Sequence, residues 1–152
     1  MNIFISDNDI LIVNVIGIEK YLSSVVGSEM PAKWPLEALK AQAIASRTYA
    51  LKQKGNSFYD IDSTNKNQVY IGLEARTNKT SRAVNSTTSL VLTYNDKLIN
   101  SLFHSSSAGM TENSQDVWKN KYPYLSSVKD FDKDNPKPVS YTHLTLPTIR
   151  EV

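Results

Sequence analysis

Apolar positions change their spacing several times along the first half of the chain, and each spacing predicts a different element. Ile and Val dominate residues 9–17 between polar neighbours, which predicts one buried strand. A short strand over residues 3–5 is expected to pair with it across a turn at Asp7-Asn8. Residues 18–26 then carry apolar side chains three and four positions apart, which is the spacing of an amphipathic helix. Gly27 and Pro31 bracket Glu29, which is therefore expected in non-helical backbone.

The longest predicted helix begins at Pro35 and ends before Gly55, with no Gly or Pro between Leu36 and Gly55. Proline suits the first turn, because the N–H that it lacks has no partner there. Alanines are spread around the helix, so it is expected to be buried on nearly every side. Lys40 and Arg47 nevertheless fall in its apolar sector. Two interpretations stay open: the cations snorkel or form an internal ion pair, or both face a cleft beside Glu29.

The second half of the chain predicts short strands and one further helix. Strands are expected at 58–62 and 67–72, a polar helix at 77–87, and a hairpin of 89–94 with 97–102 about Asn95-Asp96. No repeating strand–helix–strand pattern is present. The chain therefore predicts an α+β fold, with the long central helix packed on a mainly antiparallel sheet and with a substrate cleft.

Composition narrows the function classes. At 152 residues and 40% hydrophobic content, the chain fits one domain with a core. A formal charge of +2 argues against a nucleic-acid binder, although it is compatible with an anionic wall polymer. The chain has no cysteine, which excludes disulfides and thiolate metal sites, and it has no apolar stretch long enough to span a membrane.

Three blocks of sequence resemble one known family. EMPAKWPLEALKAQAIASRTYAL at 29–51 resembles the hallmark of the SpoIID/LytB (stage II sporulation protein D) family, and NQVYIG at 67–72 and FHSSSAGMTENSQDVW at 103–118 resemble its later blocks. The resemblance covers about residues 11–130. It implies a bacterial lytic transglycosylase that cuts peptidoglycan glycan strands, notably strands without stem peptides, outside the cytoplasm.

The resemblance also implies a site. Glu29 maps to the family's catalytic glutamate, whereas without the motif it would be read as a charge that complements a helix start. The implied substrate contacts are Lys40, Arg47, Gln68, Tyr70, His104, Ser105, Ser107 and Thr111. A serine hydrolase is disfavoured, because the strand–nucleophile–helix elbow is missing around the serines. Some members of the family carry zinc on Cys and His after the long helix; this chain has neither in that region, so no metal or other cofactor is expected.

One carboxyl group is enough for the implied chemistry. A glycoside hydrolase normally needs two carboxylates, whereas in a lytic transglycosylase the muramic acid C6 hydroxyl attacks its own anomeric carbon. Burial near Trp34, Val25 and Val26 is expected to raise the pKa of Glu29 to near neutral. Lys40 and Arg47 are then expected to contact the substrate or a neighbouring carboxylate, not Glu29. The candidate carboxylates are Glu37, Asp62 and Glu112.

Two other interpretations remain. The domain could be a non-catalytic, wall-binding enhancer of an amidase, as on the LytB side of the family, or an incomplete and inactive fragment. Residues 139–152 resemble translated sequencing-adapter sequence of the kind found in assembled metagenomes. Residues 1–138 are therefore expected to be a partial SpoIID/LytB-like domain, and 139–152 a non-native tail. The chain start lacks a signal-peptide pattern, so the native start of an extracytoplasmic, cell-envelope or secreted protein is expected to be missing.

Overall fold

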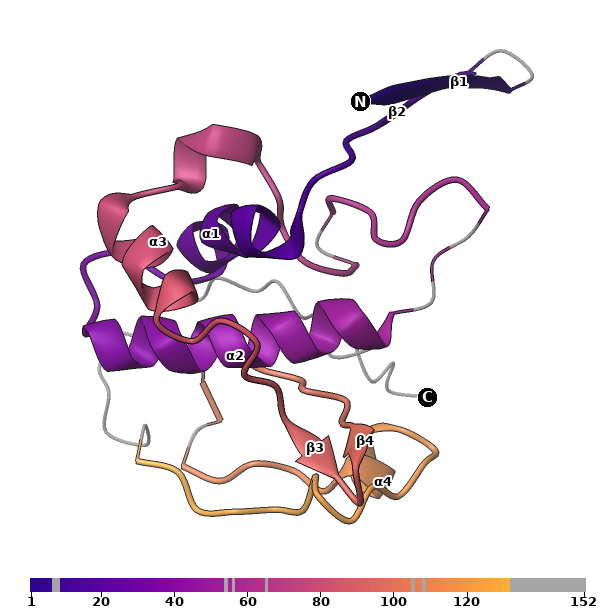
Figure 1. Cartoon of the computed structure of the whole chain (residues 1–152). Helices are drawn as coiled ribbons and strands as arrows, with labels where there is room; N and C mark the ends of the chain where they lie inside the picture. Colours follow the sequence, from indigo (N-terminus) through magenta and orange to yellow (C-terminus); the bar gives the residue numbers. More distant parts are fainter. Residues whose placement is uncertain are drawn as a thin grey trace.

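The computed structural model describes residues 1–6, 9–53, 55, 57–64, 66–104, 106–107 and 109–131. The predicted turn at Asp7-Asn8, the site residue Ser105 and the suspected tail at 139–152 lie outside these residues. The elements in chain order are β1 (Asn2–Ser6), β2 (Asp9–Val13), α1 (Ile18–Glu29), α2 (Leu36–Lys52), the 3-10 helix η1 (Gly72–Ala75), α3 (Asn78–Asn85), β3 (Thr93–Tyr94), β4 (Lys97–Leu98) and α4 (Ser114–Val117) (Figure 1).

Helix α2 lies at the centre, as predicted. Helices α1 and α3 cover one side of it, and the β3–β4 hairpin with the segment that follows lies along the other (Figure 1). The core forms where the three helices meet, and its fully buried members are Leu22, Val26, Leu39, Ala43, Ala83 and Val84. No described helix has both the length and the apolar character that crossing a bilayer requires.

The predicted α+β class is confirmed, but the predicted sheet beneath the long helix is wrong. In the described part of the chain, the strands form two separate antiparallel pairs, β1 with β2 and β3 with β4. The long helix packs on helices instead, since α2 contacts α1 and α3 more extensively than it contacts β4.

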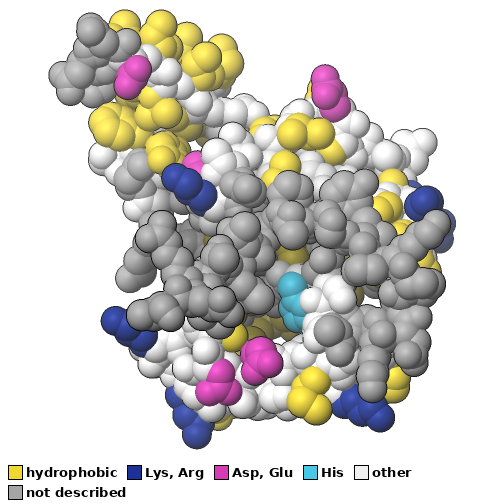
Figure 2. Space-filling model, turned by 180° about the vertical axis from the view of Figure 1, so that it is seen from behind, with side chains coloured by type: hydrophobic (Ala, Val, Ile, Leu, Met, Phe, Trp, Pro, Cys, Tyr) yellow, Lys and Arg dark blue, Asp and Glu magenta, His cyan; other side chains and the backbone are white. Residues whose placement is uncertain are grey.

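The β1–β2 ribbon extends away from the helices (Figure 1), so the prediction of one buried strand is also wrong. Cross-strand pairing places four isoleucines on one face, and all are exposed: Ile3 (59%), Ile5 (83%), Ile10 (69%) and Ile12 (62%). Apolar side chains accordingly gather on the projecting ribbon in Figure 2. On the other face of the ribbon, the Phe4 ring meets the Phe58 ring edge to face, with centroids 5.3 Å apart.

The hairpin prediction is confirmed, with strands of two residues each. Asn95 and Asp96 have φ values of 49° and 59°, which is the pair of positive angles that a type I′ turn requires. Short polar side chains tolerate this region better than most, so the turn forms without glycine. The strands predicted at 58–62 and 67–72 do not form; these segments are irregular and lead into η1.

The helix ends show where local signals were sufficient. Helix α2 begins at Leu36, one residue after the predicted start at Pro35, and ends at Lys52, three residues before Gly55. The polar helix predicted at 77–87 is confirmed as α3, and Thr77 forms a capping box with Thr80 at its start.

Glu29 was predicted in non-helical backbone, and this prediction is wrong, because Glu29 is the last residue of α1. The helix passes through Gly27, where a Cβ atom would lie 1.9 Å from the carbonyl oxygen of Ala75. Glycine is therefore required for the close approach of η1 and not as a helix stop. The helix stops before Met30, whose extended backbone is what the residue before a proline favours.

Candidate functional site

The candidate catalytic residue, Glu29, is partly exposed at the C-terminal end of α1. Its Oε1 atom accepts a hydrogen bond of 3.0 Å from the backbone N–H of Val69. The helix dipole and this hydrogen bond act on its charge in opposite directions. The negative end of the helix dipole disfavours a carboxylate, whereas the N–H donor favours one. The carboxyl group is thus held at one oxygen by a segment 40 residues away in sequence.

Residues 67–70 are hydrogen-bonded to side chains of α1 and to a side chain and a backbone carbonyl of α2. Asn67 Oδ1 accepts from the Tyr49 hydroxyl (3.2 Å). The Gln68 amide accepts from the Tyr21 hydroxyl on α1 (3.1 Å) and donates to the Ser46 carbonyl on α2 (3.2 Å). With only 1% of its surface exposed, Gln68 connects α1 to α2. Its predicted contact with substrate is therefore not supported by its position.

Tyr70 completes the segment. Its ring stacks on Tyr21 with centroids 5.3 Å apart, and its hydroxyl accepts from the Asn14 side-chain amide at 3.0 Å. Gln68 and Tyr70 both contact Tyr21, although the strand predicted at 67–72 does not form. Tyr70 is partly exposed, so a role in binding a ligand stays a prediction.

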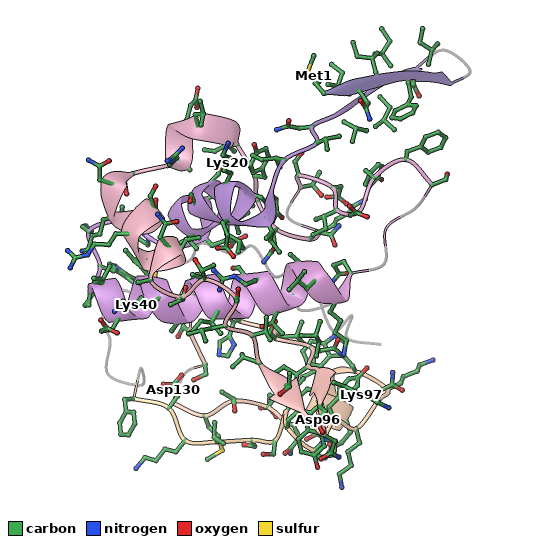
Figure 3. The ribbon with its side chains drawn as sticks, in the orientation of Figure 1. Met1, Lys20, Lys40, Asp96, Lys97 and Asp130 are labelled. Atoms are coloured by element: carbon green, nitrogen blue, oxygen red, sulfur yellow. The ribbon has the colours of Figure 1, made fainter. Side chains whose placement is uncertain are left out.

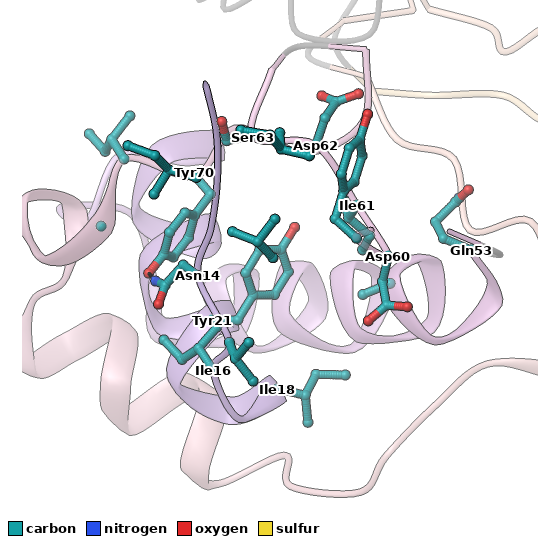
Figure 4. A pocket seen from close by; sticks show the side chains of 18 of the residues that line it. Asn14, Ile16, Ile18, Tyr21, Gln53, Asp60, Ile61, Asp62, Ser63 and Tyr70 are labelled. Atoms are coloured by element: carbon teal, nitrogen blue, oxygen red, sulfur yellow. Dashed lines mark hydrogen bonds between the residues drawn. The ribbon is translucent and has the colours of Figure 1, made fainter. Parts of the chain in front are cut away.

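A pocket of about 830 Å³ opens beside Tyr21, at the base of the β1–β2 ribbon (Figure 4). The side chains that give it polar character are Asn14, Tyr21, Gln53, Tyr59, Asp60, Asp62, Ser63 and Tyr70. Glu29 is not among the lining residues, so the pocket is a neighbour of the candidate catalytic group and does not contain it. Tyr21 lines the pocket and also interacts electrostatically with Glu29. Burial raises the pKa of its phenol well above the ordinary value, and the charge of Glu29 adds to the effect.

Asp62 lines this pocket together with Asp60. It accepts hydrogen bonds from the backbone N–H and hydroxyl of Thr64 and from the Asn67 side chain. The Thr64 hydroxyl bond is the main cause that lowers the pKa of Asp62 below its ordinary value. Asp62 therefore orders the loop that precedes residues 67–70, and the structure pairs it with polar groups instead of Lys40 or Arg47.

Arg47 forms an internal ion pair, the first of the two interpretations. Its Nε and Nη2 atoms donate to the two carboxylate oxygens of Glu19 at 3.0 and 2.7 Å. Its remaining bonds go to the carbonyls of Leu90 (3.1 Å) and Val84 (3.3 Å). Because Arg47 is 1% exposed and its donors are engaged inside the protein, its position does not support the predicted substrate contact. Glu19, which sequence reasoning missed, is the acidic residue in the first turn of α1.

Lys40 lies toward the N-terminal end of α2 (Figure 3) and pairs with Glu37 at 2.8 Å. Glu37 was one of the predicted carboxylate partners, and this pairing is confirmed. The Lys40 side chain is 28% exposed and that of Glu37 80%, so the pair is a solvated contact between neighbouring helix positions, which contributes little to stability. Contact between Lys40 and a substrate stays a prediction.

The predicted site residues Ser107 and Thr111 are hydrogen-bonded to residues 128–130. Ser107 donates to Asp130 (2.8 Å), and Thr111 pairs with Val128 through backbone and side chain, with two bonds of 2.9 Å. His104 is exposed. Asp130 lies across α2 from α1 (Figures 1 and 3). The contacts described thus bring Gln68, Val69 and Tyr70 to the α1 side, and hold Ser107 and Thr111 against residues 128–130.

Metal binding is limited by the donors present. Within the ranges that the structure describes, no group of three His, Asp or Glu side chains is arranged to hold an ion. The mechanism proposed below uses only groups of the protein and the substrate.

The chain is similar to known proteins over the region that contains the candidate site. Residues 6–94, more than half of the chain, match the family described as stage II sporulation protein (SpoIID). The chain is 40% identical over 141 residues to stage II sporulation protein D of Bacillus subtilis (strain 168), an alignment that covers 80% of this chain and 41% of the relative. It is 45% identical over 109 residues to the amidase enhancer of the same strain, covering 72% and 15%.

These relatives define a class of bacterial proteins named for sporulation or for amidase enhancement. A third, stage II sporulation protein D of Bacillus amyloliquefaciens, is 35% identical over 158 residues, covering 90% of this chain and 45% of the relative. The chain belongs to the SpoIID family, as its motif predicts. It spans less than half the length of each of these three relatives.

Proposed function

We propose that the chain is the catalytic part of a peptidoglycan lytic transglycosylase that acts outside the cytoplasm, with Glu29 as its single general acid and base. One observation carries the proposal: the glutamate of the family motif is partly exposed at a helix end, where the backbone N–H of Val69 donates to one of its oxygens. Lys40, Tyr70, His104, Ser105, Ser107 and Thr111 are the proposed substrate contacts.

The proton balance requires one carboxyl group. Protonated Glu29 donates to the glycosidic oxygen as the bond to the muramic acid anomeric carbon breaks. The C6 hydroxyl of the same muramic acid then bonds to that carbon, and the Glu29 carboxylate accepts its proton. The product is a 1,6-anhydro ring, no water is consumed, and Glu29 ends protonated. The Val69 N–H stabilises the intermediate carboxylate form.

The test is product analysis with the full chain. Purified glycan strands, with and without stem peptides, are incubated with the protein and the products are identified by mass spectrometry. Products that end in 1,6-anhydromuramic acid are expected, and Glu29→Gln should abolish them. Glu74→Gln, an exposed glutamate of η1, is the matched control and should retain activity. Reducing-end products would instead require a hydrolase with a second carboxylate.

The second candidate function is a non-catalytic enhancer of a cell-wall amidase, which the 45% identity to an amidase enhancer favours. The two functions differ in their dependence on Glu29. An enhancer should increase the rate of a purified wall amidase equally well with Glu29→Gln, and should give no anhydro products. Circular dichroism and a cooperative thermal transition must accompany both assays, because a poorly folded chain would be inactive for another reason.

A further inference from the structure

The Glu29 carboxyl group accepts a hydrogen bond from a segment with no regular structure. Residues 67–70 form neither helix nor strand, so no repeating hydrogen-bond ladder fixes the backbone of Val69. The position of the N–H that contacts Glu29 therefore depends on individual contacts on either side of it. The Tyr70 N–H donates to the Ser63 carbonyl at 3.4 Å, and the side chains that hold the segment are Gln68, which is buried, and Tyr70, which is partly exposed.

Gln68 is the stronger of the two anchors. Its amide uses both of its ends: the oxygen accepts from Tyr21 on α1, and the nitrogen donates to the Ser46 carbonyl on α2. Gln68 is 1% exposed; its bond to Ser46 is buried, and its bond to Tyr21 is partly buried. A buried amide that loses its partners costs about 1–3 kcal/mol, so the segment cannot shift without breaking both contacts at a large penalty.

One of the two hydrogen bonds of Gln68 goes to the helix that carries Glu29. Tyr21 and Glu29 both lie on α1, so the Tyr21–Gln68 bond fixes the segment directly relative to the catalytic helix. The Ser46 bond fixes it relative to α2, which prevents rotation about the first contact. A general acid must be held close to its productive geometry, and a displacement of about 1 Å can cost about a hundredfold in rate.

We propose that Gln68 is a positioning residue for catalysis: it fastens residues 67–70 to both helices so that the Val69 N–H holds the Glu29 carboxyl group in its reactive orientation. The proposal rests on the proposed function for its catalytic part. The hydrogen-bond geometry that it invokes can be tested without any turnover. It assigns Gln68 a role through Glu29 and not through contact with the glycan.

The test compares Gln68→Met with Gln42→Met in the full chain. Methionine keeps the volume and removes the hydrogen bonds. Gln42 is the matched control, since it is also buried (7% exposed) and bonds to the Ser46 side chain (3.0 Å), but it does not contact residues 67–70. The first readout is the amide proton resonance of Val69, followed by NMR as pH is varied. In the parent chain it should move as Glu29 ionises, and Glu29→Gln should abolish that movement.

Gln68→Met should reduce the amplitude of this movement by at least half, whereas Gln42→Met should leave it unchanged. In the turnover assay, Gln68→Met should lower kcat by about tenfold to a hundredfold with little change in KM, because the substrate contacts remain. If Gln68→Met does not fold, Tyr21→Phe removes only the bond to the Gln68 oxygen and should give a smaller change in the same direction.

The outcomes separate the two proposals. A Val69 resonance that does not follow Glu29 in the parent chain, or that follows it unchanged in Gln68→Met, would overturn the positioning role. A parent chain that gives no anhydro products, but in which Gln68→Met removes the Val69 response, would overturn the transglycosylase and leave the positioning of Glu29 established. Equal loss of kcat in Gln68→Met and Gln42→Met would assign both residues to general stability and refute the inference.

Discussion

The buried ion pair of Arg47 makes the sharpest prediction about stability. The change is Arg47→Met, which keeps an unbranched apolar stem and removes the charge and the donors of the side chain. It leaves the Glu19 carboxylate without its bidentate partner and the carbonyls of Val84 and Leu90 without a donor. These four contacts join α2 to α1, to the C-terminal part of α3 and to the segment after it. Their loss should therefore weaken the three-helix core.

The magnitude follows from the burial of the two partners. Removal of one member of a buried ion pair typically costs about 3–5 kcal/mol, because the other charge is left without compensation. The Arg47 side chain is 2% exposed but that of Glu19 is 29% exposed, so water can solvate part of the remaining charge. We therefore expect a loss near the lower end, about 3 kcal/mol in the free energy of unfolding. That is a large fraction of the 5–15 kcal/mol typical of a folded domain.

The assay is urea denaturation of Arg47→Met, Glu19→Gln and the double variant. The double variant should recover part of the loss, with a coupling energy of about 1–3 kcal/mol between the two sites. Lys40→Met is the control, because its pair with Glu37 is solvated and should change stability by no more than about 1 kcal/mol. Full stability of Arg47→Met together with lost glycan binding would refute this reasoning and would indicate that Arg47 contacts the substrate.

Two further predictions test the environment of Glu29. Gly27→Ala should destabilise the protein by about 1–3 kcal/mol in thermal unfolding, because its Cβ would lie 1.9 Å from the Ala75 carbonyl oxygen, which outweighs the better helix propensity of alanine. Gly17→Ala, where nothing lies within 4 Å, should cost less, and equal effects would contradict the predicted clash. Tyr21 holds its proton more tightly in the folded state than at its ordinary pKa of 10.0, so stability should be constant up to about pH 10 and should fall as pH rises above it. In Tyr21→Phe the urea midpoint should fall less between pH 8 and pH 10.5, while Tyr94→Phe, an exposed tyrosine, should behave like the parent; an unchanged fall in Tyr21→Phe would assign the pH dependence to other groups.

Signals that act over a few residues were sufficient to predict much of the fold. Proline next to the start of α2 and the Asn95-Asp96 turn each act on their own backbone, and the long helix and the hairpin formed close to where they were predicted. The family motif likewise identified Glu29 as the candidate catalytic residue and led to the correct family.

Only the tertiary structure decided which groups meet. The partner of Arg47 is 28 residues away, Gln68 meets a tyrosine 47 residues away, and the donor to Glu29 comes from 40 residues away in an irregular segment. Residues 9–17 were predicted from their composition to form one buried strand, but Ile10 and Ile12 are exposed, because among the described residues β2 pairs with β1 alone in a sheet of two strands. The physical reason is range: propensities, caps and turns bias the backbone of neighbouring residues. The partner of a buried charge, or the path of a segment without regular structure, depends on which distant side chains the packed helices bring within hydrogen-bond distance.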